Sequence, residues 1–249
     1  MSATIQYGSR QFKVDFTKPL DISIPIQDGD SNVNAWYVGP PKIQPFSDGE
    51  FTGAVRNGAD VNFNKISCIP HSHGTHTECV GHITETVHSV NTHLRKYFHV
   101  AELITVAPEK LGDDFVISAK QLSYALRNKK REAVIIRTLP NTLQKRTQQY
   151  SHTNPPYLLE EATQYLAGKG IKHLLIDLPS IDKEQDEGAL KAHRAFWGVD
   201  DKIRYDATIT EFIYVDNKIE DGTYLLDLQV APIENDASLS RPVLYAPLQ

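Results

Sequence analysis

The alternation of apolar and polar positions predicts an α/β chain with buried strands through its middle. Residues 100–106 and 133–137 form short apolar runs rich in β-branched side chains, which is typical of strands covered on both faces. Between these two runs, residues 118–126 open with Ser118, a favoured helix N-cap, and repeat apolar positions at helical spacing. The order strand, helix, strand indicates a sheet with helices packed against it.

The same order continues toward the C-terminus. Residues 158–167 repeat apolar positions at helical spacing, and Gly170 is suited to end that helix before a strand over 171–177. Residues 84–98 show a weaker helical pattern. We therefore expect helices at all three places.

Both ends of the chain predict β-hairpins. The opening hairpin joins residues 4–6 to 11–15 across a turn that contains glycine, and residues 21–26 follow as a short alternating strand. The closing hairpin joins residues 207–215 to 223–230 across a polar connection.

The segment between the first strands and the middle of the chain is irregular. Residues 27–60 are rich in Gly, Pro, Asn and Asp and predict a long ordered loop, a feature that is uncommon unless it serves a site. Residues 61–76 read as the next strand. Together the elements predict an α/β fold with a mixed central sheet and hairpins at both ends, in a single domain over residues 1–249.

Composition narrows the functional class. The chain is 40% apolar and 23% charged with a net charge of −5, a globular profile without the basic stripe that a nucleic-acid partner requires. No stretch approaches the apolar length of a membrane span. Two cysteines, Cys68 and Cys79, make no disulfide framework, so we expect a cytoplasmic protein.

Histidines are concentrated in one short segment. Four of them, together with a carboxylate and a cysteine, lie within the twelve residues from His71 to His82. Neutral imidazole is the commonest metal ligand among side chains, and a nearby carboxylate completes a suitable donor set. The segment therefore predicts a metal site.

An extended conformation over residues 70–78 would sort these side chains onto two faces. Ser72, His76 and Glu78 then point one way, so that His76 and Glu78 grip one cation. His71 and His73 point the other way and serve packing, unless a bulge turns one of them onto the ligand face.

A cation held by His76 and Glu78 would lower the pKa of a water to about 7 and polarise a carbonyl. His82 follows a turn at Gly81 and lies near enough to transfer protons in such a reaction. Two alternatives stay open: Cys79 as a nucleophile paired with His82, and a closed structural zinc site.

The segment resembles the cyclase-like metal-dependent hydrolases, a family that includes bacterial kynurenine formamidase and isatin hydrolase. Their signature runs His-x-Gly-Thr-His-x-Asp-x-Pro-x-x-His, and the matching stretch here is Ser72-His-Gly-Thr-His-Thr-Glu-Cys-Val-Gly-His82. Residues 21–25 resemble the family's opening strand, and 176–182 resemble its Gly-Ile-Asp-x-x-Ser-x-Asp element.

The resemblance implies a site and a fold. His76 and Glu78 would be metal ligands, His82 the proton-transfer residue, and His193 and Glu211 the ligands from the C-terminal half. The fold would be a swivelling β/α/β domain that assembles as homodimers or homotetramers. Its cofactor would be a divalent ion, Zn or Mn.

The chain departs from the signature at three positions. Ser72 stands where the family has its first ligand histidine, Glu78 replaces Asp, and Val80 replaces Pro. The loss of one imidazole favours one metal ion over two. Alternatively, a bulge brings His71 or His73 into the site.

Together with the predicted metal site, the resemblance implies a metal-dependent hydrolase that cleaves the carbonyl–nitrogen bond of a small amide, formamide or cyclic amide through metal-activated water. Trp36 in the long loop is a candidate for binding the small-molecule substrate. The alternative function is a protein of the same fold that binds a metal or small ligand without turnover, because Ser72 weakens the site.

Overall fold

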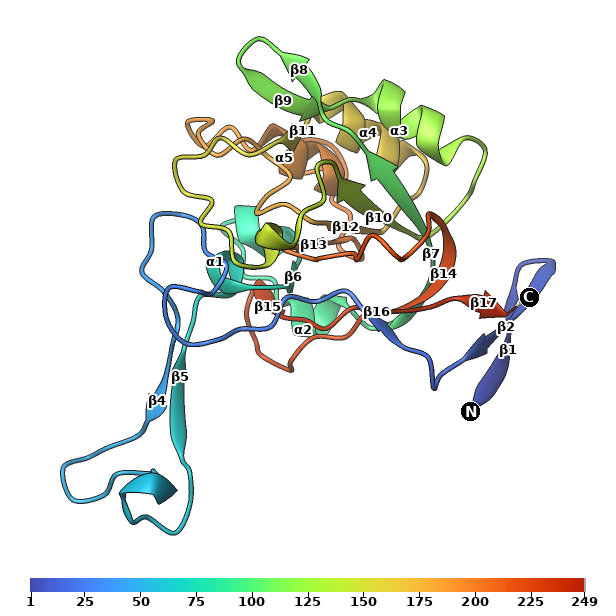
Figure 1. Ribbon diagram of the computed structural model, residues 1–249. Coiled ribbons are helices and arrows are strands. Elements are labelled where there is room, and N and C mark those ends of the chain that lie inside the picture. The colour runs from blue at the N-terminus through green and yellow to red at the C-terminus, as the bar shows by residue number, and fades with distance from the viewer. Residues whose placement is uncertain (249) are drawn as a thin grey trace.

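The computed structural model describes residues 1–248, and within them a mixed sheet of nine strands forms the centre of the molecule (Figure 1). The order across the sheet is β15 (Ala237–Leu239), β6 (His76–Glu78), β13 (Thr208–Glu211), β12 (His173–Ile176), β10 (Ala133–Thr138), β7 (Phe98–Val106), β14 (Gly222–Asp227), β16 (Val243–Tyr245) and β3 (Leu20–Asp21). The four middle strands, β13, β12, β10 and β7, run parallel, and the strands on both flanks pair antiparallel.

The two apolar runs predicted as buried strands are confirmed at β7 and β10, and the strand predicted over 171–177 is confirmed as β12. Ile135 in β10 pairs with Leu103 on one side and Leu175 on the other, and all three side chains are buried. Because successive side chains alternate between faces, Val134 and Ile136 enter a different apolar cluster from Ile135. Both faces are therefore covered, which explains the continuous apolar runs.

Three helices cover one face of the sheet: α3 (Ala119–Leu126), α4 (Glu160–Gly168) and α5 (Lys191–Trp197). The predicted helices at 118–126 and 158–167 are thus confirmed. The Ser118 side chain accepts a hydrogen bond from the backbone N–H of Gln121, and the Gln121 side chain accepts one from the N–H of Ser118. This capping box explains why α3 begins where the sequence predicts.

The region predicted as a helix over 84–98 is mostly irregular. Only α2 (Val90–His93) is helical there, and Val90 and Leu94 pack against the other face of the sheet. The prediction of a long helix was wrong because the apolar positions serve one short turn and the start of β7.

The opening hairpin is confirmed as β1 (Ser2–Tyr7) and β2 (Arg10–Asp15), with Gly8 at φ 59° in its turn. A C-terminal strand, β17 (Pro247–Leu248), pairs with β2. A further small sheet contains β8 (Glu109–Leu111), β9 (Asp114–Ile117) and β11 (Tyr157–Leu158).

The closing hairpin was predicted wrongly. Its two strands exist as β13 and β14, but β13 pairs with β12 and β6, whereas β14 pairs with β7 and β16. The polar connection spans the sheet rather than forming a turn. Residues 21–26 likewise contain little strand: β3 ends at Asp21, and Ser23 makes one isolated bridge to Ile213.

The segment predicted as a loop over 27–60 and a strand over 61–76 contains an antiparallel ribbon instead. Its strands are β4 (Lys42–Pro45) and β5 (Asn64–Ser67), with the short 3-10 helix η1 (Val55–Asn57) between them. Figure 1 shows the ribbon projecting away from the body. All four residues of β5 are exposed, so this strand has no buried face.

Within residues 1–248, the helices are all too short or too polar to cross a membrane.

Candidate metal centre

The histidine segment changes conformation twice within fourteen residues. It runs through α1 (Pro70–His73), β6 and the 3-10 helix η2 (Val80–Ile83). Pro70 stands at the start of α1, where its missing N–H costs no helical hydrogen bond. A Cβ on Gly74 would lie 2.9 Å from Ile26 Cγ1, so glycine permits a close approach after the helical turn. The extended conformation predicted for residues 70–78 is therefore wrong for the first half of the segment.

His76 and Glu78 share one side of β6, as the alternation predicts, and both are fully buried. His76 Nε2 lies 3.9 Å from Glu78 Oε2. The other ring nitrogen, Nδ1, lies 3.1 Å from the Gly74 carbonyl oxygen and donates its proton there. The lone pair of His76 Nε2 is thus directed toward a carboxylate.

The structure brings Glu211 and His193 to the same place. Antiparallel pairing sets Glu211 opposite His76, with Glu211 Oε2 3.5 Å from His76 Nε2. His193, on α5, has its Nε2 3.1 Å from Glu78 Oε1 and 3.8 Å from Glu211 Oε1. The residues that the resemblance selected from the C-terminal half therefore meet the histidine segment.

Asp182 holds the far side of the His193 ring. Its Oδ2 lies 2.6 Å from His193 Nδ1 and also accepts the His193 backbone N–H, while its Oδ1 accepts the N–H of Ala192. Because this carboxylate fixes the ring from behind, Nε2 faces Glu78.

His71 lies inside the cluster, and the expectation that it faces away was wrong. Its Nδ1 is 3.1 Å from Glu78 Oε2, and its ring stacks on His82 at 4.2 Å between centroids. The cause is the helical turn at 70–73, which removes the strand alternation on which that expectation rested.

Asp236, which the sequence did not single out, completes the open side of the cluster. Its Oδ2 lies 2.8 Å from His71 Nε2 and 3.4 Å from His82 Nδ1. His82 Nε2 is 3.8 Å from Glu78 Oε2. His71, His82 and Asp236 keep 21–32% of their side-chain surface exposed, whereas Glu78 and His76 have none, so solvent reaches the cluster from this side.

The remaining candidates lie apart from these contacts. His73 Nδ1 accepts the Ile69 N–H and its Nε2 lies 3.0 Å from the Gly39 carbonyl, so it holds backbone together. Ser72 is buried, and its carbonyl accepts the N–H of Ala35. Trp36 donates its indole N–H to the His71 carbonyl, which places it beside α1.

Cys79 is a poor nucleophile in this setting. Its thiol is buried and donates to the His88 carbonyl at 3.3 Å. Burial raises the pKa of the Cys79 thiol to about 11, so little thiolate forms at neutral pH.

The carboxylates and imidazoles shift each other's pKa strongly. Burial alone would raise the pKa of Glu78, but the charge of His82 and the contacts with His193 and His71 hold it well below its usual range. Burial would lower the pKa of His71, yet its contacts with Asp236 and Glu78 raise it to about 10. His193 follows the same pattern: burial would lower its pKa, but the contacts with Asp182 and Glu78 raise it to about 10.

The cluster fits a divalent cation. Among residues 1–248, His76 Nε2 and Glu78 Oε2 are buried atoms with no hydrogen-bond partner. Buried polar atoms are rarely left unpaired, because each costs about 1–3 kcal/mol. His71, His76 and Glu78 each offer one donor atom, and these atoms lie within 4.8 Å of one another. Imidazole nitrogens mixed with carboxylate oxygens suit zinc or manganese.

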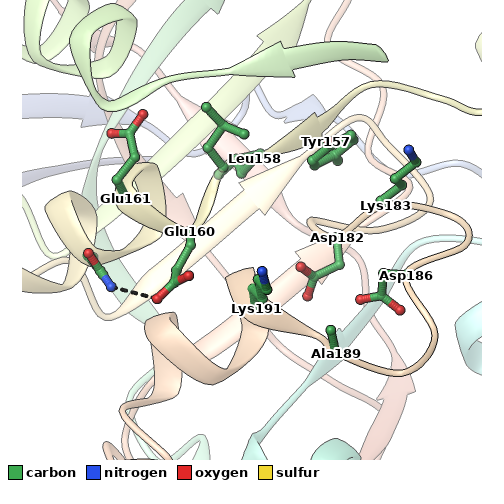
Figure 2. A pocket seen from close by; sticks show the side chains of 11 residues that line it. Tyr157, Leu158, Glu160, Glu161, Asp182, Lys183, Asp186, Ala189 and Lys191 are labelled. Atoms are coloured by element: carbon green, nitrogen blue, oxygen red, sulfur yellow. Dashed lines mark hydrogen bonds between the residues drawn. The ribbon is translucent and has the colours of Figure 1, made fainter. Parts of the chain in front are cut away.

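Two cavities lie beside the cluster without containing its histidines. One, of about 620 Å³, lies between the starts of α4 and α5 and is lined by Asp182, the residue that holds His193 (Figure 2). The other, of about 600 Å³, is lined by Thr75 and Tyr214, and Thr75 precedes His76. The cluster's histidines, Glu78 and Glu211 therefore line neither of these cavities.

A second pair of buried histidines lies at the N-terminal ends of two parallel strands. His173 opens β12 and His99 stands near the start of β7, with 3.9 Å between ring centroids. His173 Nδ1 lies 2.9 Å from Thr208 Oγ1, and His99 Nε2 lies 2.8 Å from the Lys96 carbonyl. Burial lowers the pKa of both rings, well below the usual value for His173.

Comparison with known proteins places this arrangement among related folds. The sequence profile of the family described as "Putative cyclase" matches residues 17–183. A predicted metal-dependent hydrolase from Bacillus stearothermophilus has a TM-score of 0.64 at 19% identity, covering 92% of this chain and 98% of that one. No match was found among curated proteins.

Two isatin hydrolase structures share the fold as well. Isatin hydrolase A from Labrenzia aggregata, bound to benzyl benzoate, has a TM-score of 0.67 at 12% identity, covering 93% of this chain and 94% of that one. An isatin hydrolase bound to the product analogue thioisatinate has a TM-score of 0.64 at 16% identity, covering 93% of each chain.

Proposed function

Because the chain belongs to the cyclase family, we propose that it is a metal-dependent hydrolase acting on the carbonyl–nitrogen bond of a small amide, formamide or cyclic amide. One observation carries the proposal: the unpartnered Nε2 of His76 and Oε2 of Glu78 converge in a buried cluster. The relatives named as isatin hydrolases support the choice of a cyclic amide. The proposal includes the family's swivelling β/α/β fold, with residues 1–249 as one domain.

His76, Glu78, Glu211 and His193 are the residues we propose to hold the ion. A divalent cation in this position supplies Lewis acidity, which polarises a carbonyl and acidifies a water molecule. The protein's own groups exclude bulk solvent on the inner side, where His76 and Glu78 are fully buried.

His82 is the proposed proton carrier. Its ring is 32% exposed on the open side of the cluster, and its Nε2 lies 3.8 Å from Glu78 Oε2. A base in this place receives the proton of the attacking water at Nε2 and returns it to the departing nitrogen. Asp236 Oδ2 lies 3.4 Å from the other nitrogen, Nδ1, and orients the ring.

A second candidate function is binding without turnover. Ser72 is the observation that favours it, because a neutral hydroxyl is a weak ligand where the related sequences carry imidazole. One experiment distinguishes a protein that hydrolyses a substrate from one that only binds metal.

The experiment starts with protein purified without added metal. Ions per chain are counted, and hydrolysis of isatin, N-formylkynurenine and simple lactams is followed with zinc and with manganese. We expect bound metal and hydrolysis of at least one cyclic amide or formamide. His82→Ala should keep the metal and lose turnover. Bound metal with no turnover across the panel would favour the binding role, and no bound metal would overturn both functions.

We also propose that the chain assembles as a homodimer or homotetramer. The β4–β5 ribbon supports this, because Phe63 and Ile66 are 56% and 62% exposed and an isolated two-stranded ribbon is marginally stable in water. Light scattering should show a mass above that of one chain, reduced by Phe63→Ser. Val87→Ser, at an exposed apolar residue outside the ribbon, is the control. A monomeric wild-type protein would contradict the proposal.

A further inference from the structure

The cluster contains the imidazole of His71, which the alternation of side chains along a strand would direct away from it. His71 precedes Ser72, the position at which the resemblance expects a ligand, and yet the His71 ring lies against Glu78. The helical turn of α1 produces this exchange, because residues 71 and 72 of a helix point in directions about 100° apart. The helical turn thus directs the side chain of His71, rather than that of Ser72, into the cluster.

The contact between His71 and Glu78 has the form expected of two ligands of one ion. His71 Nδ1 lies 3.1 Å from Glu78 Oε2, but the pair falls outside hydrogen-bond geometry, and Glu78 Oε2 has no hydrogen-bond partner among residues 1–248. His76 Nε2 lies on the same side of that oxygen. Two ring nitrogens and one carboxylate oxygen therefore converge without bonding one another.

Asp236 determines which nitrogen of His71 faces the cluster. Its Oδ2 lies 2.8 Å from His71 Nε2 and accepts a hydrogen bond there, so Nδ1, which faces Glu78, is the nitrogen left to bind a cation that displaces its proton. A carboxylate behind an imidazole is the usual arrangement that fixes the tautomer of a metal ligand.

A second imidazole with an aspartate behind it lies on the opposite side of Glu78. Asp182 lies 2.6 Å from His193 Nδ1, and His193 Nε2 faces Glu78 Oε1. Each oxygen of Glu78 thus meets one imidazole, and each imidazole is held by its own aspartate. The two rings present opposite nitrogens, as two ligands on either side of one carboxylate would.

We propose that His71 supplies the third imidazole of the metal centre, in place of the histidine that the related sequences carry at the position of Ser72. Asp236 is the positioning residue that fixes the tautomer of His71. This inference rests on the proposed function only in that the cluster binds a divalent cation. The helical turn at Pro70 compensates for the serine by shifting the ligand one position along the chain.

Metal affinity tests the inference directly. Kd values for zinc and manganese are measured by equilibrium dialysis against a chelator, and the visible spectrum of the cobalt-loaded protein reports the ligand set. Ser72→Ala should keep the wild-type affinity and spectrum, whereas His71→Ala should weaken affinity by at least about 100-fold and change the cobalt bands. Asp236→Asn should weaken affinity by about 10–100-fold, the range seen for residues behind a ligand. Asp236→Glu, which keeps the carboxylate, should recover part of this loss.

Two further variants keep the test decisive. The exchange variant His71→Ser with Ser72→His should bind metal more tightly than His71→Ala, because the imidazole returns to the position used in the related signature. His152→Ala, at an exposed histidine, controls for the loss of an imidazole, and circular dichroism confirms folding.

The outcomes separate this inference from the proposed function. If the wild-type protein binds no divalent ion, both fall. If it binds metal and His71→Ala binds equally well, or Ser72→Ala loses as much affinity as His71→Ala, the His71 assignment is overturned while the hydrolase proposal stands.

Discussion

The histidines of the candidate metal centre and the buried pair at the starts of β7 and β12 differ in the groups that they contact. At the candidate metal centre, each oxygen of Glu78 lies 3.1 Å from an imidazole nitrogen, and two of the rings have pKa values raised to about 10. In the other pair, His99 and His173 contact mainly a carbonyl and a hydroxyl, and burial keeps both rings neutral. The carboxylate partners, not burial, decide whether a buried imidazole carries charge.

The comparison also separates a binding site from a structural contact. Glu132 Oε2 lies 3.5 Å from His99 Nδ1, but this carboxylate is 32% exposed and pairs with Lys96 at 2.7 Å. Glu78 is fully buried and, in the part of the chain that the structure describes, its ion-pair partners are all histidines. A buried carboxylate with no permanent cation beside it is the feature that calls for a metal.

Replacing Glu78 should produce the largest effect. Glu78→Gln keeps the shape but removes the charge that four imidazoles face at 3.1–3.9 Å. We expect at least about a 100-fold loss of metal affinity, above the range for residues behind a ligand. We also expect the metal-free protein to lose about 3–5 kcal/mol, because a buried ion pair is broken. Metal content after dialysis and urea unfolding measure the two effects, and retained metal would contradict the assignment.

The pH dependence of the metal-free protein should be the next largest effect. His71 and His193 have folded pKa values raised to about 10, above the unfolded value of about 6.5. Their contribution is fully present below pH 6.5 and is lost as the pH rises from 6.5 to 10. Tm should therefore fall over this range without metal.

Loading with zinc should reverse this trend, because ligand nitrogens must be deprotonated and binding strengthens as the pH rises. Tm measured from pH 6.5 to 9 with and without zinc checks the pair of slopes. Parallel slopes would contradict a cation that replaces protons in the cluster.

The other histidine pair should respond in the opposite direction. Folded pKa values of His173 and His99 are lowered, so their contribution is present above pH 6.5 and is lost as the pH falls below it. Each ring should add a slope of up to about 1.4 kcal/mol per pH unit below pH 6.5. Urea unfolding from pH 7 to 5 should show a flatter dependence for His173→Gln than for the wild-type protein.

The smallest effect should come from Glu132. Glu132→Gln removes a partly exposed carboxylate, and exposed ion pairs contribute about 0–1 kcal/mol. We expect stability to change within that range and metal affinity to stay unchanged. A large loss of metal would mean that the two histidine groups are coupled across the sheet.

The sequence predicted what depends on near neighbours. Val134 to Ile136 form a strand because an apolar, β-branched run is stable only when buried, and Ser118 begins α3 through contacts three residues away. His76 and Glu78 share a side because they stand two apart in a strand. These features need no knowledge of distant parts of the chain.

The features that the sequence did not predict depend on contacts between residues far apart in the chain, which no local pattern indicates. Asp236 reaches His71 across 165 positions, and no spacing rule connects them. His71 itself was misplaced because Pro70 starts a helical turn where alternation predicted a strand. The prediction of a closing hairpin was wrong for a similar reason, because β13 pairs with β12 and β14 pairs with β7, rather than with each other.

The position of β6 between β13 and β15 has a consequence for synthesis on the ribosome. Both neighbours, and with them His193, Glu211 and Asp236, emerge more than a hundred residues after Glu78. A nascent chain therefore carries the histidines in an incomplete pocket until translation is nearly finished. A message truncated after residue 183 would encode the whole region that matches the family profile, but it would lack three residues of the candidate metal centre: His193, Glu211 and Asp236.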